Sequence, residues 1–246
     1  MMTELYVKTV YSCGKTIVSD CFFTSPCKIA KPFYREDGYT EVMVMCASPG
    51  ILAGDKYNMR FEMSDNTKTI ISEQSYRKLY NTGADFSEQN TCIQIGESAV
   101  LHYVPYPVIP FEGSRFYSQT DISLHPSSKL IFGDIFTCGR HGMGEQFAFN
   151  DISSRTIIYI EDKPIFLDNC RMTAGEADFS GIGFFEGFTC QGMFYLYGFE
   201  SLSLPNDDEI QGAVSKSSAG YTVRLFGNSA ASLYQFACRL FYSLLS

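Results

Sequence analysis

The residues of this chain best suited to chemistry gather in one glycine-rich segment, Cys138-Gly-Arg-His-Gly-Met-Gly-Glu145. Cys138 and His141 stand in a C-x-x-H arrangement, and Glu145 follows four residues later. Thiolate, imidazole and carboxylate groups are ligands that Zn²⁺ or Ni²⁺ accepts, but a closed site needs about four, and no second pair occurs at a matching spacing. One hypothesis is therefore a metal-dependent enzyme that uses Cys138, His141 and Glu145. Another is a looser set of polar groups along a passage.

The same segment also allows a purely structural interpretation. Gly139 and Gly144 permit backbone conformations or close approaches that a side chain would block. Arg140 and Glu145, fixed by these glycines, are suited to a salt bridge that holds a turn.

Asp55 is a second carboxylate placed by a loop. An apolar run at residues 39–47, which predicts a strand, leads into Ser48-Pro-Gly-Ile-Leu-Ala-Gly-Asp55. Pro-Gly followed by Gly54-Asp55 indicates a tight loop that brings a carboxylate next to the core. The structural alternative is that Asp55 only caps the turn, because aspartate readily accepts nearby backbone N–H groups.

A polar stretch follows a predicted strand that begins at Lys68. It places Ser72, Glu73 and Lys78 beside aromatic residues. Its mixed charge is typical of a solvated strand or a single helical turn.

Composition excludes several classes of function. The chain has no G-x-S-x-G elbow and only three histidines, so nucleophilic catalysis has little support. The net charge of −8 argues against nucleic acid as a partner. Nine cysteines, an odd number without C-x-x-C spacing, favour reduced thiols in the cytoplasm. No apolar run reaches the roughly 18 residues of a membrane span, and no secretory signal is visible.

The elements that would position these groups are mostly strands. Aromatic residues make up 15% of the chain, with 21 Phe and 16 Tyr, and no repeat or linker divides residues 1–246, so we expect one mainly β domain. Pro105, Pro107 and Pro110 precede Phe111 and predict a rigid extended connection that is neither a helix nor a central strand. Apolar residues at helical spacing predict a terminal amphipathic helix over residues 230–245.

Four of these motifs, in this order and spacing, resemble the urease accessory protein family called UreD, or UreH in Helicobacter-type bacteria. They are Ser48-Pro-Gly-Ile-Leu-Ala-Gly-Asp55, the stretch from Ser72 to Tyr80, Pro105-Tyr-Pro-Val-Ile-Pro-Phe111, and Gly139-Arg-x-x-x-Gly-Glu145. The family usually has threonine where this chain has Ser72, which keeps the hydroxyl. His141 occupies a position that varies in the family.

The resemblance implies stacked, partly helical β-sheets with a few helices near the C-terminus. It also implies a non-catalytic scaffold that binds UreF and, through it, the GTPase UreG, and that contacts apo-urease while Ni²⁺ is delivered. Ni²⁺ would be transient cargo, and no cofactor would be permanently bound. The residues expected along an internal polar passage are Asp55, Ser72, Glu73, Arg140 and Glu145. Those expected to shape the family motifs are Gly54, Lys78, Pro107, Pro110, Phe111, Gly139 and Gly144.

Overall fold

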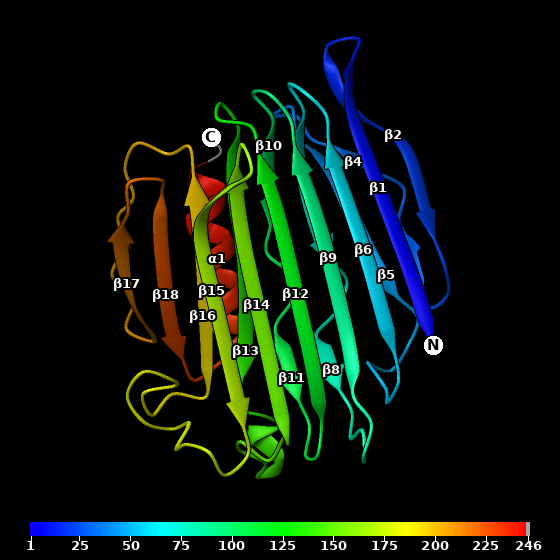
Figure 1. The fold of residues 1–246 in the computed structure, drawn as a ribbon. Coiled ribbons are helices and arrows are strands. Elements are labelled where there is room, and N and C mark those ends of the chain that lie inside the picture. Colours follow the sequence, from blue (N-terminus) through cyan, green and yellow to red (C-terminus); the bar gives the residue numbers. More distant parts are fainter. Residues whose placement is uncertain (245–246) are drawn as a thin grey trace.

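The structure is a computed structural model that describes residues 1–244. It consists of strands, one short 3-10 helix and one α-helix (Figure 1). The helices are η1 (His141–Met143) and α1 (Ala230–Ser243). The strands are β1 (Met2–Ser12), β2 (Lys15–Phe23), β3 (Cys27–Ile29), β4 (Phe33–Tyr34), β5 (Thr40–Cys46), β6 (Lys56–Met63), β7 (Lys68–Glu73), β8 (Arg77–Leu79), β9 (Ser87–Ile95), β10 (Val100–Tyr103), β11 (Val108–Pro110), β12 (Arg115–Leu124), β13 (Lys129–Thr137), β14 (Asp151–Ile160), β15 (Lys163–Thr173), β16 (Cys190–Tyr197), β17 (Ile210–Lys216) and β18 (Tyr221–Gly227).

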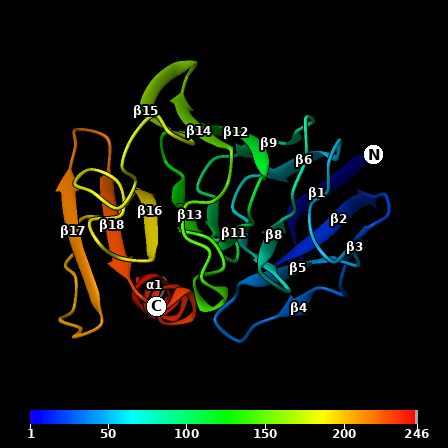
Figure 2. The same cartoon turned by 90° about the horizontal axis from the view of Figure 1, so that it is seen from below.

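The strands form two sheets that lie face to face (Figure 2). Sheet A has the order β15-β14-β12-β9-β6-β1-β2, and the main path of sheet B runs β17-β18-β16-β13-β10-β7-β5-β3. Between β5 and β14 the chain passes back and forth between the sheets, and each pass adds a parallel strand. The central part is therefore a β-solenoid, with antiparallel strands added at its margins.

The main hydrophobic core fills the space between the two sheets. Alternate residues along the central strands of both sheets point into it, as the period of two requires. Phe61 from sheet A meets Tyr103 from sheet B with ring centroids 5.4 Å apart, and Phe132 lies beside Tyr103 at 6.0 Å. Part of the high Phe and Tyr content of the chain therefore lies in this core.

Helix α1 covers the outer face of sheet B and forms a second core there. The buried residues of the helix pack on outward-facing residues of β13, β16 and β18, among them Ile131 and Phe194. The helix begins where the Ser229 hydroxyl accepts a hydrogen bond from the Ser232 backbone N–H at 3.1 Å. The expected terminal helix is confirmed through Ser243. Leu245, the end of its expected range, lies outside the described residues.

The predicted fold class is confirmed, with two differences of detail. The helical part near the C-terminus is a single α-helix among residues 1–244. The proline-rich connection is not wholly outside the sheets, because Val108–Pro110 pairs with β8 and touches β13. Pro110 is tolerated there because it ends a strand of three residues.

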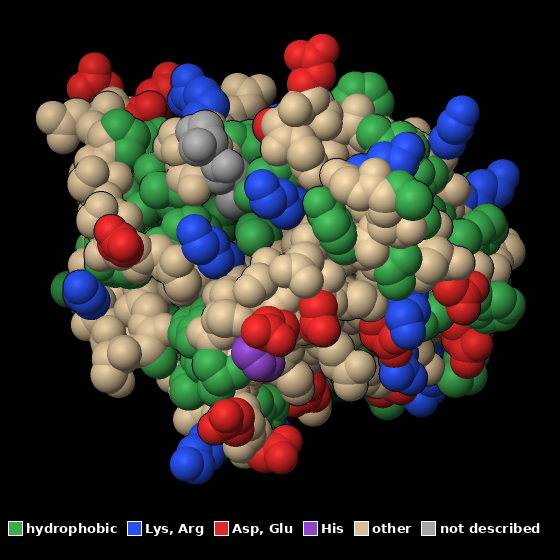
Figure 3. Space-filling model, turned by 90° about the horizontal axis from the view of Figure 1, so that it is seen from above, with side chains coloured by type: hydrophobic (Ala, Val, Ile, Leu, Met, Phe, Trp, Pro, Cys, Tyr) green, Lys and Arg blue, Asp and Glu red, His purple; other side chains and the backbone are tan. Residues whose placement is uncertain are grey.

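The surface carries charges of both signs. On the face drawn in Figure 3, acidic and basic side chains lie among one another. Among the described residues, no helix combines the length and the apolar character that a membrane crossing would require.

Candidate functional site

The sequence motifs that are far apart along the chain come together near the lower end of Figure 1, around β8 and β11. Ile51 bridges to Leu79, and the Lys78 carbonyl accepts the Ile51 N–H at 2.8 Å. Lys78 also pairs with Ile109 in the parallel β8–β11 ladder. We call this assembly of residues 48–55, 77–80, 105–111 and 139–145 the motif cluster.

The proline residues of the motif cluster hold the chain against β8, because their carbonyls accept hydrogen bonds and their backbone angle φ is fixed. The Pro107 carbonyl accepts the Arg77 N–H at 3.1 Å, and Pro110 lies opposite Leu79. The next residue, Phe111, donates its N–H to the Leu79 carbonyl at 2.9 Å. The Pro-rich string is therefore tied to β8 by regular backbone contacts.

Arg140 and Glu145 form the salt bridge that the structural interpretation anticipated. The Arg140 Nε donates to Glu145 Oε2 at 2.8 Å, and Nη2 donates to Oε1. The guanidinium lies over the Phe111 ring, 4.2 Å from its centroid, and Glu145 also accepts the Glu112 N–H at 3.3 Å. Hydrogen bonding to Arg140 lowers the pKa of Glu145.

The glycines of this turn have backbone angles that favour glycine. Gly144 ends η1 at φ +79°, and Gly139 has φ +132°. A Cβ built on Gly139 would lie 3.0 Å from the Glu145 carbonyl oxygen. The backbone thus approaches itself closely at Gly139, where a side chain would collide.

Asp55 adopts the local role that was its structural alternative. Its Oδ2 accepts the Leu52 N–H at 2.9 Å. The preceding Gly54 has φ +75° and donates its N–H to the Phe86 carbonyl at 2.9 Å. Asp55 therefore closes a turn, and any contact of Asp55 with nickel stays a prediction.

Ser72 and Glu73 are neighbours in β7, so their side chains point to opposite faces of sheet B. The Ser72 hydroxyl donates to Glu41 Oε1 at 2.7 Å on the outer face. Glu73 is 8% exposed and points into the space between the sheets, like Ile71 before it. The two residues therefore cannot line one continuous site.

Glu73 is the centre of a buried polar group, which we call the inter-sheet cluster: Glu73, Arg77, Gln89, Tyr103 and Asp134. Arg77 binds both carboxylate oxygens, with Nη2 to Oε1 at 3.0 Å and Nε to Oε2 at 3.1 Å. Tyr103 donates its hydroxyl to Oε1 at 3.3 Å. From sheet A, the Gln89 amide oxygen accepts Arg77 Nη1 at 3.4 Å. The cluster therefore links the two sheets across the core.

Asp134 adds a second carboxylate that the motif analysis did not identify. It lies on β13 between the core residues Phe132 and Phe136, and therefore on the inner face of sheet B. Desolvation raises the pKa of Asp134 to about 6, while Arg77 opposes the shift and Glu73 and Asp168 add to it. The signal in the sequence was a charged residue inside an otherwise apolar strand.

A cavity of about 70 Å³ reaches the inter-sheet cluster from the surface near Ser75 and Tyr76. Glu73, Arg77 and Gln89 line its inner part. Such a volume is large enough for a few water molecules, and the lining supplies polar partners for them. The space between the sheets is therefore not solid at this point.

The hypothesis of an enzyme built on Cys138, His141 and Glu145 is not supported by the geometry. Cys138 is 1% exposed, whereas His141 lies on the exposed helix η1 and its Nδ1 contacts Gln146 Nε2 at 2.7 Å. Glu145 is bound to Arg140. Within residues 1–244, no three His, Cys, Asp or Glu side chains are grouped closely enough to hold a metal ion.

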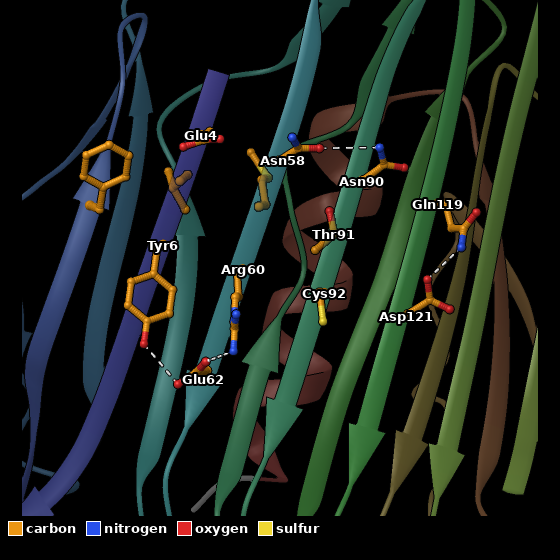
Figure 4. A pocket seen from close by; sticks show the side chains of 13 residues that line it. Glu4, Tyr6, Asn58, Arg60, Glu62, Asn90, Thr91, Cys92, Gln119 and Asp121 are labelled. Atoms are coloured by element: carbon orange, nitrogen blue, oxygen red, sulfur yellow. Dashed lines mark hydrogen bonds and ion pairs between the residues drawn. The ribbon is translucent and has the colours of Figure 1, made fainter. Parts of the chain in front are cut away.

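A wide hollow lies elsewhere, on the outer face of sheet A, with a volume of about 740 Å³ (Figure 4). Polar side chains line the hollow and form hydrogen bonds with one another. The Tyr6 hydroxyl donates to Glu62 at 3.0 Å, and Gln119 donates to Asp121 at 2.7 Å. Because these groups satisfy one another, we read the hollow as a solvated sheet face and not as a reaction centre.

Comparison with known proteins gives a consistent result. A family model described as "UreD urease accessory protein" matches residues 3–244. The urease accessory protein UreD of Acetivibrio thermocellus is 36% identical over 239 residues, which is 93% of this chain and 91% of the relative. UreH of Helicobacter acinonychis, also called a urease accessory protein, is 34% identical over 220 residues, 87% of this chain and 84% of the relative.

Proposed function

This chain belongs to the UreD urease accessory protein family, and we propose that it is a non-catalytic scaffold that helps deliver Ni²⁺ to apo-urease. A urease accessory role follows from the family. The delivery of nickel, the partners and the route are the proposal. The observation that supports a route for nickel through the protein is the inter-sheet cluster, which borders a cavity large enough for a few water molecules.

The proposed partners are UreF, bound directly, UreG, bound through UreF, and the urease apoenzyme. Exposed aromatic side chains support a surface for protein partners. Phe22 is 53% exposed on β2, and Phe33 and Tyr34 on β4 are 65% and 49% exposed. Large apolar groups in water favour association, because burial against a partner removes them from solvent. A cytoplasmic location belongs to the same proposal and rests on the expectation of reduced thiols.

The proposed passage uses Glu73 and Asp134 as its carboxylates. Near pH 7 an aspartate with a pKa of about 6 is mostly ionised, so two negative charges face the single positive charge of Arg77. This excess favours a cation over an anion. The Arg77 contacts also prevent Glu73 from binding the ion tightly, which suits cargo that must leave again.

The experiment is co-expression of the chain with UreF, UreG and the urease apoenzyme, followed by affinity purification and measurement of nickel per urease. We expect one complex, and we expect Asp134→Asn to lower the nickel content of urease several-fold while the complex stays intact. Asp134→Asn is chosen because Glu73→Gln would leave the buried Arg77 without a counter-ion. Glu41→Gln, on the outer face of sheet B, is the matched control.

The outcomes separate the two parts of the proposal. Recovery of the chain as a lone monomer in the presence of all partners would overturn the scaffold. An intact complex in which Asp134→Asn loads urease with as much nickel as Glu41→Gln would overturn the passage.

A further inference from the structure

Two of the nine cysteines, Cys27 on β3 and Cys46 on β5, lie opposite each other in an antiparallel ladder. Cys27 is 2% exposed, and Cys46 is half-buried. Both side chains line the same small cavity between the sheets. The proposed nickel passage borders the same cavity, but its carboxylates are Glu73 and Asp134 and not these thiols.

The backbone hydrogen bonds fix how closely the two cysteines approach. The Ala47 N–H donates to the Pro26 carbonyl and the Ala30 N–H to the Met43 carbonyl, both at 2.9 Å. This pattern makes Cys27 and Cys46 a non-hydrogen-bonded pair, whose Cα atoms lie roughly 4.5 Å apart in such ladders. Disulfides span Cα separations of about 4.4 to 6.8 Å, so this pair can be bridged without moving the strands far.

We propose that Cys46 is a modification site for low-molecular-weight disulfides and that Cys27 resolves the adduct into a cross-strand disulfide. The proposal goes beyond the nickel scaffold and does not depend on it. Cys46 is the more exposed of the two cysteines, so a small reagent reaches its sulfur atom before that of the buried Cys27.

The chemistry proceeds in two exchanges. The Cys46 thiolate attacks one sulfur of the reagent RSSR, a Cys46–SR bond forms, and RS⁻ leaves. Cys27 then loses its proton and attacks the Cys46 sulfur, the Cys27–Cys46 bond forms, and a second RS⁻ leaves. The protein dithiol is oxidised by two electrons, and one RSSR is reduced to two thiols.

The roles follow from the environments of the two sulfur atoms. A hydrogen bond from Cys27, with further hydrogen bonds from the Ser48 backbone and Tyr57, lowers the pKa of Cys46 to about 6 against the effect of burial. The same hydrogen bond and burial raise the pKa of Cys27. Near neutral pH, Cys46 is therefore the nucleophile and Cys27 the protonated partner.

The test treats the reduced, folded protein with 2-hydroxyethyl disulfide at pH 7 and analyses an unreduced digest by mass spectrometry. We expect a Cys27–Cys46 cross-link without retained reagent, while exposed Cys13, Cys21 and Cys92 keep it as mixed disulfides. In Cys27→Ala the adduct on Cys46 should persist, and in Cys46→Ala Cys27 should stay unmodified. Cys92→Ala is the control and should leave the cross-link unchanged.

A rate measurement distinguishes this from chance reactivity. The alkylation rate of Cys46 should fall several-fold as the pH drops through about 6. If Cys27→Ala does not fold, Cys27→Ser keeps a hydrogen-bond donor and should still accumulate the adduct. A persistent adduct on Cys46 in the unaltered protein, or a cross-link formed only after unfolding, would overturn the proposal.

Discussion

At the scale of single residues, His102 is the clearest unpaired polar group. Its ring is 3% exposed between sheet B and α1, 5.1 Å from the Tyr242 ring. Neither ring nitrogen has a hydrogen-bond partner within residues 1–244. Desolvation, with a smaller effect of the Arg35 charge, lowers the pKa of His102 to about 4.

The first prediction concerns the pH dependence of stability. The unfolded chain binds a proton at His102 near pH 6.5, but the folded chain does so only near pH 4. Stability is therefore lost as the pH falls from about 6.5 to about 4, by roughly 3 kcal/mol in total. His102→Leu should remove this part of the slope in urea unfolding at a series of pH values. The exposed His125→Leu is the control, and equal slopes for both variants would contradict the assignment.

Gly139 gives a second prediction, which concerns backbone strain. In Gly139→Ala, the alanine would have φ +132°, and its Cβ would lie 3.0 Å from the Glu145 carbonyl oxygen and 3.3 Å from the Pro110 carbonyl oxygen. The substitution should therefore lower the free energy of unfolding by about 1 to 3 kcal/mol. Gly142→Ala, three residues away, meets nothing within 4 Å and should change it by less than about 0.5 kcal/mol. Urea denaturation compares the two. Similar losses would mean that the close approach at Gly139 is not the cause.

Residue roles were only partly predictable from sequence. The alternatives stated for Asp55 and for Arg140 with Glu145 describe their local contacts, which join residues within about five positions. Their contacts with Met1, Phe111 and Glu112 were not predicted, because those residues are distant in the sequence. The inter-sheet cluster was not predictable in this way. Its contact between Arg77 and Gln89 joins different sheets, and sequence spacing does not reveal which strands face each other.

At the scale of elements, strands with strong alternation or apolar runs were predictable, and weak edge strands were not. The turn at Glu161 and Asp162, both with positive φ, joins β14 to β15 as a hairpin. Strand β17 carries no clear strand signal, because its residues are mostly exposed and include glycine. Its strand form comes from pairing with β18 and not from its own preference.

Helix α1 provides the prediction at this scale. Ser229→Ala removes the hydroxyl that accepts the Ser232 N–H, so the free energy of unfolding should fall by about 1 kcal/mol. Ser232→Ala is the matched control, since only the backbone of Ser232 takes part in this cap. Thermal and urea unfolding provide the measurement. A loss in the control as large as that in Ser229→Ala would refute the capping role.

At the scale of the whole molecule, the solenoid is the organising feature. The fold class followed from the family resemblance, whereas the succession of passes between the sheets leaves no repeat in the sequence. Each pass between the sheets needs only apolar residues on its inner side. Many different sequences meet that condition, so the residues do not specify which strand lies beside which. Patterning therefore predicted strands and one domain, but not their order in the two sheets.

The core between the sheets leads to the last prediction. Phe61 is fully buried and contacts Tyr103 across the sheets, so Phe61→Ala should lower the free energy of unfolding by about 3 to 5 kcal/mol. Ile182→Ala, at a side chain 94% exposed, should be nearly neutral. Circular dichroism and tyrosine fluorescence should report the same unfolding midpoint. A loss of less than about 1 kcal/mol for Phe61→Ala would show that this layer does not hold the sheets together.

The position of α1 has a consequence for synthesis on the ribosome. Strands β5 to β14 can join their sheets in the order in which they emerge, because most of them pair with strands made shortly before. The outer face of sheet B, with Ile131 and Phe194, has to wait for residues 230–243. A nascent chain therefore exposes this apolar surface until translation is almost finished. During that interval the chain has the greatest need of a chaperone.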